Sequence, residues 1–138
     1  MVSAEVVVKA QFYDLDPMGV VWHGHYTRFM EQARCELLDR IGYNYEEMRE
    51  SGYLWPVVDM RIKYVRPVRF SQEIRVVAAV TEYKYRLCIK YEIFDCQDGA
   101  LLTKADTVQL AILEESQELC FQSPAVLIER IEKLLSRE

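Results

Sequence analysis

Glycine and proline are scarce in this chain, which has 5 and 4 of them among 138 residues. Such low numbers exclude a collagen-like or low-complexity segment and a long flexible linker. Apolar runs are short as well, and the longest, residues 76–80, is far too short to cross a membrane. Residues 1–10 contain Glu5 and no long apolar core, so we expect no signal peptide. We therefore expect one soluble, cytoplasmic domain that spans residues 1–138.

Positive charge and paired cysteines are also in short supply. Lys and Arg number 17 against 22 Asp and Glu, and the formal net charge of -5 excludes a uniformly basic nucleic-acid binder. The 4 cysteines form no CxxC pair, which excludes the usual spacing of a structural zinc site or a thioredoxin-like redox motif. We therefore expect free thiols in a reducing compartment and no nucleic-acid partner.

The chain does contain a strongly periodic apolar pattern over residues 25–41. Seven apolar residues recur at helical spacing and predict one buried stripe on a helix of about five turns. They are Tyr26, Phe29, Met30, Ala33, Leu37, Leu38 and Ile41. Gly42 is placed to end this helix in the left-handed conformation. Residues 44–51 predict a second, short helix that is capped by Asn44.

The remaining segments favour strands. Residues that are β-branched or aromatic predict strands over 5–12, 56–70, 73–83, 86–94 and 101–113. We expect a hairpin between the third and fourth of these strands and a meander of the last four. Residues 124–136 predict an amphipathic helix with Ser123 as its N-cap. This order of elements predicts an α+β fold in which one long helix packs on a curved antiparallel sheet.

Residues 13–26 hold the densest group of reactive side chains, including both histidines of the chain. One interpretation is a metal site, because His23 and His25 stand two apart and Asp14 or Asp16 could add an oxygen ligand. The pattern lacks the i, i+4 histidine pair of the zinc hydrolases. A second interpretation is structural: Asp16 holds its own turn through an Asx hydrogen bond, and a histidine caps the following helix.

A third interpretation is catalytic, since a carboxylate just before a helix combines two useful groups. The free N–H groups of the first helical turn can hold a developing oxyanion. The carboxylate can attack a carbonyl or deprotonate a water that does so. Together these groups suit acyl transfer to water, and thioester hydrolysis in particular, because a thiolate is a good leaving group.

This loop and the start of the helix resemble a motif of the hotdog-fold acyl-CoA thioesterases, in the group of the 4-hydroxybenzoyl-CoA thioesterases and YbgC-like proteins. That motif is roughly D-x-D-x-x-G-V-V-x-H-x-x-Y, followed by an E-x-A-R segment on the helix. The matching residues are Asp14, Asp16, Gly19, Val20, Val21, His23, Tyr26, Glu31, Ala33 and Arg34. Residues 57–74 also look like the family's second strand, so the resemblance extends to about residue 113.

The resemblance implies a hotdog fold, in which a five-stranded antiparallel sheet wraps around one long helix, here with a C-terminal helix added. It also implies a homo-oligomer, either a dimer whose sheets join edge to edge or a homotetramer, with the active site at the dimer interface. The implied activity is hydrolysis of an acyl-CoA or acyl-carrier-protein thioester without a metal or cofactor. Asp16 would be the base or nucleophile, and the backbone N–H at His23 would be the oxyanion donor.

The same resemblance marks residues that line the acyl site. They are Gly19, Val20, Trp22 and Tyr26, although Tyr26 could equally be a core residue at the start of the helix. His25 stands where the family commonly has Asn, and we expect it to hold the loop and to alter acyl specificity.

Basic side chains are expected at the mouth of the cleft, because coenzyme A is anionic. Arg61, Lys63 and Arg66 are close together in the sequence and are candidates for phosphate contacts. The alternative is that these charges belong to a solvated edge strand and discourage aggregation.

Two other functions remain open. A hotdog dehydratase acting on hydroxyacyl thioesters relies on a catalytic His in an H-F-P-type motif, whereas this chain has Trp22, His23 and Gly24 there. A non-catalytic module that binds acyl thioesters would not need a carboxylate at the carbonyl, so Asp16 argues against it.

Overall fold

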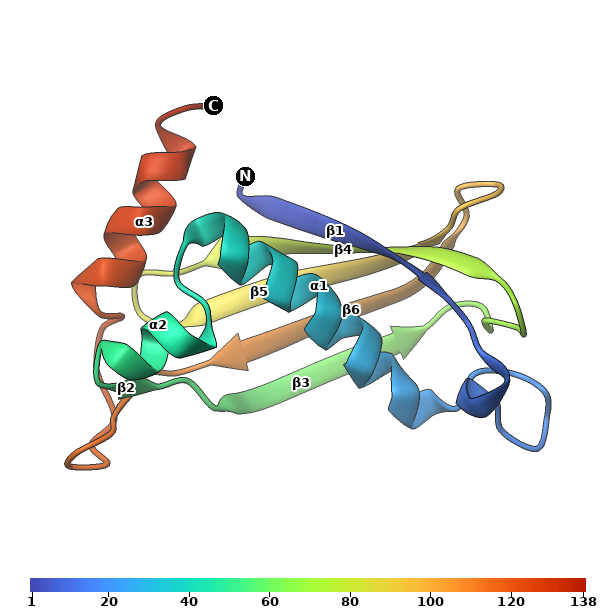
Figure 1. Cartoon of the computed structure of the whole chain (residues 1–138), viewed down its shortest axis with the longest axis horizontal. Helices are drawn as coiled ribbons and strands as arrows, with labels where there is room; N and C mark the ends of the chain where they lie inside the picture. The colour runs from blue at the N-terminus through green and yellow to red at the C-terminus, as the bar shows by residue number, and fades with distance from the viewer.

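The computed structural model describes residues 1–138 and shows one long helix lying across the face of a curved sheet (Figure 1). The strands are β1 (Ser3–Lys9), β2 (Tyr53–Leu54), β3 (Val57–Tyr64), β4 (Glu73–Glu82), β5 (Leu87–Asp95), β6 (Leu101–Gln109) and β7 (Ile112–Leu113). The helices are α1 (Tyr26–Ile41), α2 (Tyr45–Glu50) and α3 (Ala125–Leu135), and 3-10 turns form η1 (Phe12–Asp14) and η2 (His23–His25). The predicted α+β architecture is confirmed.

Five strands form one antiparallel sheet in the order β1-β4-β5-β6-β3. β4, β5 and β6 follow one another as predicted, but β3 pairs with β6 and not with β4. The predicted meander of four strands is therefore wrong at its first connection. Alternating residues indicate that a segment is a strand, but they do not indicate which neighbour it joins. This topology leaves β1 and β3 as the two edges of the sheet (Figure 1).

The predicted strand over residues 101–113 is broken in the structure. β6 ends at Gln109, and β7 pairs with β2 in a separate two-stranded sheet. The buried side-chain amide of Gln109 donates to the Trp55 carbonyl at 2.8 Å. This contact joins the end of β6 to the segment just before β3. The two residues are 54 positions apart, so the local sequence pattern does not predict their contact.

Helix α1 buries the predicted apolar stripe against the sheet. Its seven inward residues are at most 4% exposed. Gly42 ends the helix with a φ of 79°, as predicted. Asn44 caps α2 as predicted, because its side chain accepts from the Tyr45 N–H at 2.7 Å. The long helix is therefore held rigidly along its length, which fixes the position of its first turn.

The C-terminal helix α3 begins at Ala125, one residue later than predicted. Pro124 is the N-cap, and the buried Ser123 hydroxyl has no hydrogen-bond partner, so the predicted cap at Ser123 is wrong. The Ser123 N–H donates to the Lys84 carbonyl, which places Ser123 in the preceding connection. Arg130 donates to the Gly42 carbonyl and attaches α3 to the end of α1. No helix in the structure is both long and apolar enough to cross a membrane.

Candidate active site

The loop between η1 and η2 folds back on itself around Asp16. The Asp16 N–H donates to the Val20 carbonyl at 2.8 Å, and the Gly19 N–H donates to the Asp16 carbonyl at 3.0 Å. Gly19 has a φ of 79°, which a residue without a Cβ adopts at little cost. One oxygen of the Asp16 carboxylate, Oδ1, accepts from the Met18 N–H at 2.8 Å. The predicted Asx turn is therefore present, and it leaves Oδ2 of Asp16 without a protein hydrogen bond.

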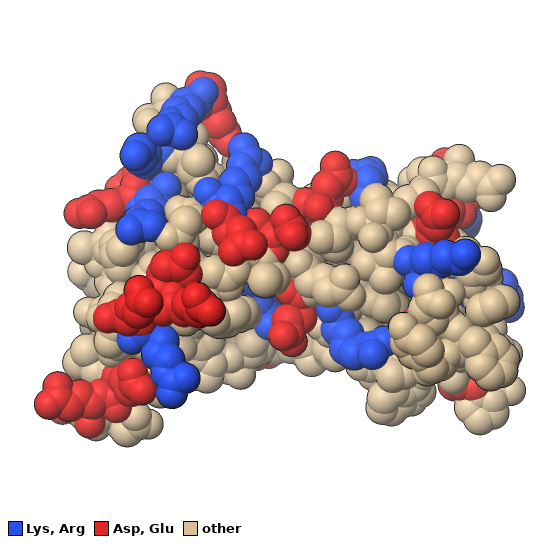
Figure 2. Space-filling view, in the orientation of Figure 1, with Lys and Arg blue, Asp and Glu red and all other residues tan.

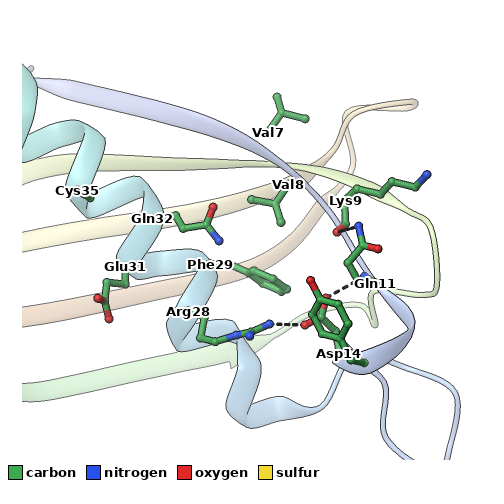
Figure 3. Close-up of a pocket in the computed structure, with 11 residues that line it drawn as sticks. Val7, Val8, Lys9, Gln11, Asp14, Arg28, Phe29, Glu31, Gln32 and Cys35 are labelled. Carbon is green, nitrogen blue, oxygen red and sulfur yellow. Dashed lines mark hydrogen bonds and ion pairs between the residues drawn. The ribbon is translucent and has the colours of Figure 1, made fainter.

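An ion pair between the buried Asp14 and the half-exposed Arg28 braces the base of this loop (Figure 3). Asp14 is only 2% exposed, and its carboxylate accepts from the Gln11 N–H at 2.8 Å and from the guanidinium of Arg28 on α1. The Asp14 carbonyl also accepts from the Trp22 N–H at 2.9 Å. Asp14 thus connects the start of the loop, its end and the first turn of α1.

The turn η2 leads directly into α1 and contains both histidines. Neither η2 nor α1 has a side-chain N-cap, so the predicted histidine cap is wrong. The backbone N–H groups of His23 and Gly24 have no acceptor in the protein, as is usual at the beginning of a helix. They are therefore free to donate to a bound ligand.

The Trp22 indole packs closely over this turn. Its ring lies 5.1 Å from the His23 ring and 5.3 Å from the His25 ring, measured between centroids. A Cβ added to Gly24 would meet the indole at 2.3 Å, so the ring lies directly against the Gly24 backbone. The two imidazoles therefore flank an aromatic ring. No group of three His, Cys, Asp or Glu side chains is arranged to hold a metal ion.

A cavity of about 270 Å³ opens between this loop, α1 and the end of β3. Its lining is Asp16, Met18, Val20, Val21, His23, Tyr26, Tyr64, Val65, Arg66 and Pro67. Five of the sequence-predicted site residues thus meet at one place: Asp16, Val20, His23, Tyr26 and Arg66. Carboxylate, helix N-terminus and a basic group surround a largely apolar space, which suits an acyl group attached to an anionic carrier.

Two tyrosines form one wall of this cavity. Tyr26 is 2% exposed, and its ring meets the Tyr64 ring edge to face at 4.9 Å. Burial raises the pKa of both Tyr26 and Tyr64 above the ordinary value of 10.0. Both hydroxyls are therefore protonated near neutral pH. Tyr26 is a core residue and also lines the cavity.

Other predicted site residues lie outside the lining of this cavity. Gly19, Trp22 and His25 belong to the surrounding loop and turn. Arg61 and Lys63 alternate along β3 with Ile62, which packs on the core, so they lie on the opposite face of the sheet. The structure therefore does not bring Arg61 or Lys63 to Asp16.

The structure has two larger hollows as well. One, of about 680 Å³, lies between β1 and α1 and contains Asp14 and Arg28 (Figure 3). The other, of about 860 Å³, has Arg66 and Arg69 in its wall together with three carboxylates. Arg66 belongs to both this groove and the Asp16 cavity, so the two spaces meet at that side chain.

The end of the molecule that carries the loop has few charged groups on the face that α1 presents (Figure 2). Large apolar side chains are exposed there, namely Phe12, Tyr13, Met18, Trp22 and Phe70. The sequence analysis missed Arg28 and Tyr64 in this region. For Arg28 the available signal was its place in the first turn of the helix, whereas Tyr64 was marked only by its position at the end of a predicted strand.

Fold and site together define a hotdog-type thioesterase. A family model described as the thioesterase-like superfamily matches residues 10–128, and the chain belongs to that family. This finding confirms the resemblance stated above and makes the protein a thioester hydrolase.

Individual relatives agree with this assignment. A Bacillus subtilis protein, YneP, provisionally named an acyl-CoA thioesterase, is 29% identical over 110 residues, which is 79% of each chain. A provisionally named esterase of Synechocystis is 30% identical over 131 residues, covering 94% of this chain and 79% of the relative. Among solved structures, the DHNA-CoA thioesterase of Staphylococcus aureus superposes with a TM-score of 0.86 and 26% identity, covering 99% of this chain and 93% of that one.

Proposed function

We propose that this chain hydrolyses an acyl thioester at the Asp16 cavity to a free acid and a thiol. The observation that carries the proposal is that Asp16 and His23, whose backbone N–H has no acceptor in the protein, line one 270 Å³ cavity. A thioester carbonyl between them would have a carboxylate on one side and oxyanion donors on the other. That is the arrangement that acyl transfer to water requires.

Asp16 acts in this proposal through its free carboxylate oxygen. As a base, it takes a proton from water while the water oxygen bonds to the carbonyl carbon. The tetrahedral oxyanion then collapses, the C–S bond breaks, and the departing sulfur takes the proton from Asp16. As a nucleophile, Asp16 would instead bond to the carbonyl carbon and expel the thiolate, and water would then hydrolyse the mixed anhydride.

The carrier is coenzyme A or an acyl carrier protein in this proposal. YneP has an acyl-CoA thioesterase name, and two chloroplast relatives from Arabidopsis thaliana are named acyl-acyl carrier protein thioesterases. The two carriers share a phosphopantetheine arm. In this proposal Arg66, an exposed residue of the cavity lining, contacts a phosphate of that arm.

We also propose that β3 joins the β3 strand of a second copy, as the family resemblance implies. β3 is an edge strand, and the apolar side chains of Val58, Met60 and Tyr64 are about half exposed on it. An unpaired edge with such side chains is a template for pairing with another strand. Replacing Met60 by Lys is expected to shift the protein to monomers in sedimentation analysis, and an unchanged oligomer would contradict this interface.

The test of the activity is thiol release from short, long and aromatic acyl-CoA and acyl-carrier-protein substrates. Asp16→Asn keeps an oxygen that can accept from the Met18 N–H but removes the charge, so kcat is expected to fall by about 10²-fold or more at unchanged stability. Asp98→Asn is the matched control, because Asp98 makes the same kind of contact, to the Ala100 N–H at 2.8 Å.

Each outcome of this test has a definite meaning. Activity that disappears in Asp16→Asn and survives in Asp98→Asn supports the proposal. Equal activity in both variants would show that Asp16 only stabilises its turn and takes no part in the reaction. Dehydration of hydroxyacyl thioesters without hydrolysis would favour a lyase, and binding without turnover of any thioester would favour a binding module.

A further inference from the structure

Tyr64 lines the cavity, and its side chain forms a hydrogen bond to the turn η2. Its hydroxyl donates to the backbone carbonyl of His23 at 2.7 Å, across 41 positions of sequence. This is the usual distance for a hydrogen bond between an O–H donor and an oxygen acceptor. This bond connects the end of strand β3 to the turn that contains His23, which also lines the cavity.

A hydrogen bond to the His23 carbonyl also fixes the orientation of the next N–H group. N–H groups point toward the start of a helix and carbonyls toward its end, and each peptide unit is planar. A donor that holds the His23 carbonyl therefore also orients the Gly24 N–H, which belongs to the same peptide unit. A hydrogen bond to a carbonyl also polarises its peptide and strengthens the N–H as a donor, because linked hydrogen bonds reinforce one another.

One further contact holds the Tyr64 ring, and another holds the turn. The Tyr64 ring packs edge to face on Tyr26, whose side chain is buried in the core. On the other side of the turn, the Trp22 indole lies against Gly24. The turn is thus clamped between an indole that packs on its backbone and a phenol that holds its carbonyl.

We propose that Tyr64 is a positioning residue for the thioesterase reaction, whose hydroxyl orients and polarises the His23–Gly24 peptide at the oxyanion site. This inference rests on the proposed function. Tyr64 acts through the backbone, and it need not touch the substrate. Its loss should therefore weaken transition-state stabilisation while leaving substrate binding nearly unchanged.

The test compares Tyr64→Phe with wild type and with Tyr85→Phe, an exposed tyrosine on the β4–β5 connection. Tyr64→Phe removes one oxygen and keeps the ring that packs on Tyr26. We expect kcat to fall about tenfold with KM changed less than about twofold, which is smaller than the loss of a direct oxyanion donor. Tyr85→Phe is expected to keep the wild-type kcat.

The chemical shift of the His23 carbonyl carbon in NMR provides a readout that does not depend on activity. It is expected to differ between Tyr64→Phe and wild type, because that carbonyl loses the hydrogen bond from the phenol. A normal kcat together with an unchanged His23 carbonyl shift would overturn the proposal. A fall in thermal stability with normal kcat would also overturn it, since Tyr64 would then be merely structural.

Failure of the inference and failure of the proposed function give different results. If wild type hydrolyses thioesters and Tyr64→Phe matches it, only the role of Tyr64 is refuted. If wild type hydrolyses no acyl-CoA and no acyl-carrier-protein substrate, the proposed function fails, and the role of Tyr64 fails with it.

Discussion

The Asp14–Arg28 ion pair offers a quantitative test of how the active-site loop is held. Asp14→Ala removes the acceptor of the Gln11 N–H and the charge that faces Arg28. Hydrogen bonds to a charged group contribute about 1.5–3 kcal/mol each, but Arg28 is 52% exposed and regains water when its partner is lost. We therefore expect a total loss of about 2–3 kcal/mol in the free energy of unfolding.

This loss converts into a measurable change in the thermal midpoint. A chain of 138 residues unfolds with an entropy of about 0.3 kcal/mol/K, so Tm should fall by about 7–10 °C. The assay is thermal unfolding followed by circular dichroism at one fixed protein concentration, because association would also shift Tm.

A double-mutant cycle with Arg28→Ala separates the ion pair from the hydrogen bond to Gln11. Arg28→Ala alone leaves the Asp14 charge buried with one remaining donor, so it too should destabilise the fold. The coupling between the two substitutions should be about 1 kcal/mol, since one partner is half exposed. A Tm of Asp14→Ala within about 1 °C of wild type would refute the idea that this brace holds the loop.

Three further predictions concern the turn, the core and the response to pH. Gly24→Ala places a Cβ within 2.3 Å of the Trp22 ring, so the indole must move. Tryptophan fluorescence should then shift and kcat should fall, and adding Trp22→Ala should restore part of kcat. An unshifted fluorescence spectrum would contradict the packing of Trp22 on Gly24. Leu37→Ala should cost about 2.7–5 kcal/mol in chemical denaturation because Leu37 is fully buried, and a cost below about 1 kcal/mol would argue against that placement of α1. Burial raises the pKa of Tyr91 above its ordinary value of 10.0, so Tyr91 loses its proton in the unfolded state first as pH rises. The stability of the fold should therefore be unaffected by this group below about pH 10 and should decline above it. Tyr91→Phe should flatten this decline of Tm with pH, and an unchanged decline would count against the role of Tyr91.

Local sequence pattern predicted the elements that local physics controls. The spacing of the apolar residues from Tyr26 to Ile41 specifies an amphipathic helix. Gly42 ends that helix because it adopts a left-handed conformation, and Asn44 begins the next because its side chain caps it. The buried alternation on β4 and β5 follows from the period of two in a strand. The same kind of reasoning found the Asx turn at Asp16, since that contact spans only two residues.

Other features depended on contacts between distant parts of the chain. The pairing of β3 with β6, the break after Gln109 and the capping role of Pro124 were all wrong or missing in the sequence analysis. The sequence analysis grouped three basic residues that the structure separates: Arg66 follows the end of β3 and lines the cavity, whereas Arg61 and Lys63 lie on the opposite face of the sheet.

The sequence by itself therefore determined the fold class, the long helix and the position of the Asp16 loop, because these follow from periodicity, turn chemistry and a motif that lies within a continuous stretch of chain. Only the tertiary structure placed Arg28 beside Asp14 and the Tyr64 hydroxyl on the His23 carbonyl. Those contacts join residues 14 and 41 positions apart. Such pairings form only when the whole chain buries its apolar surface, so no local pattern encodes them.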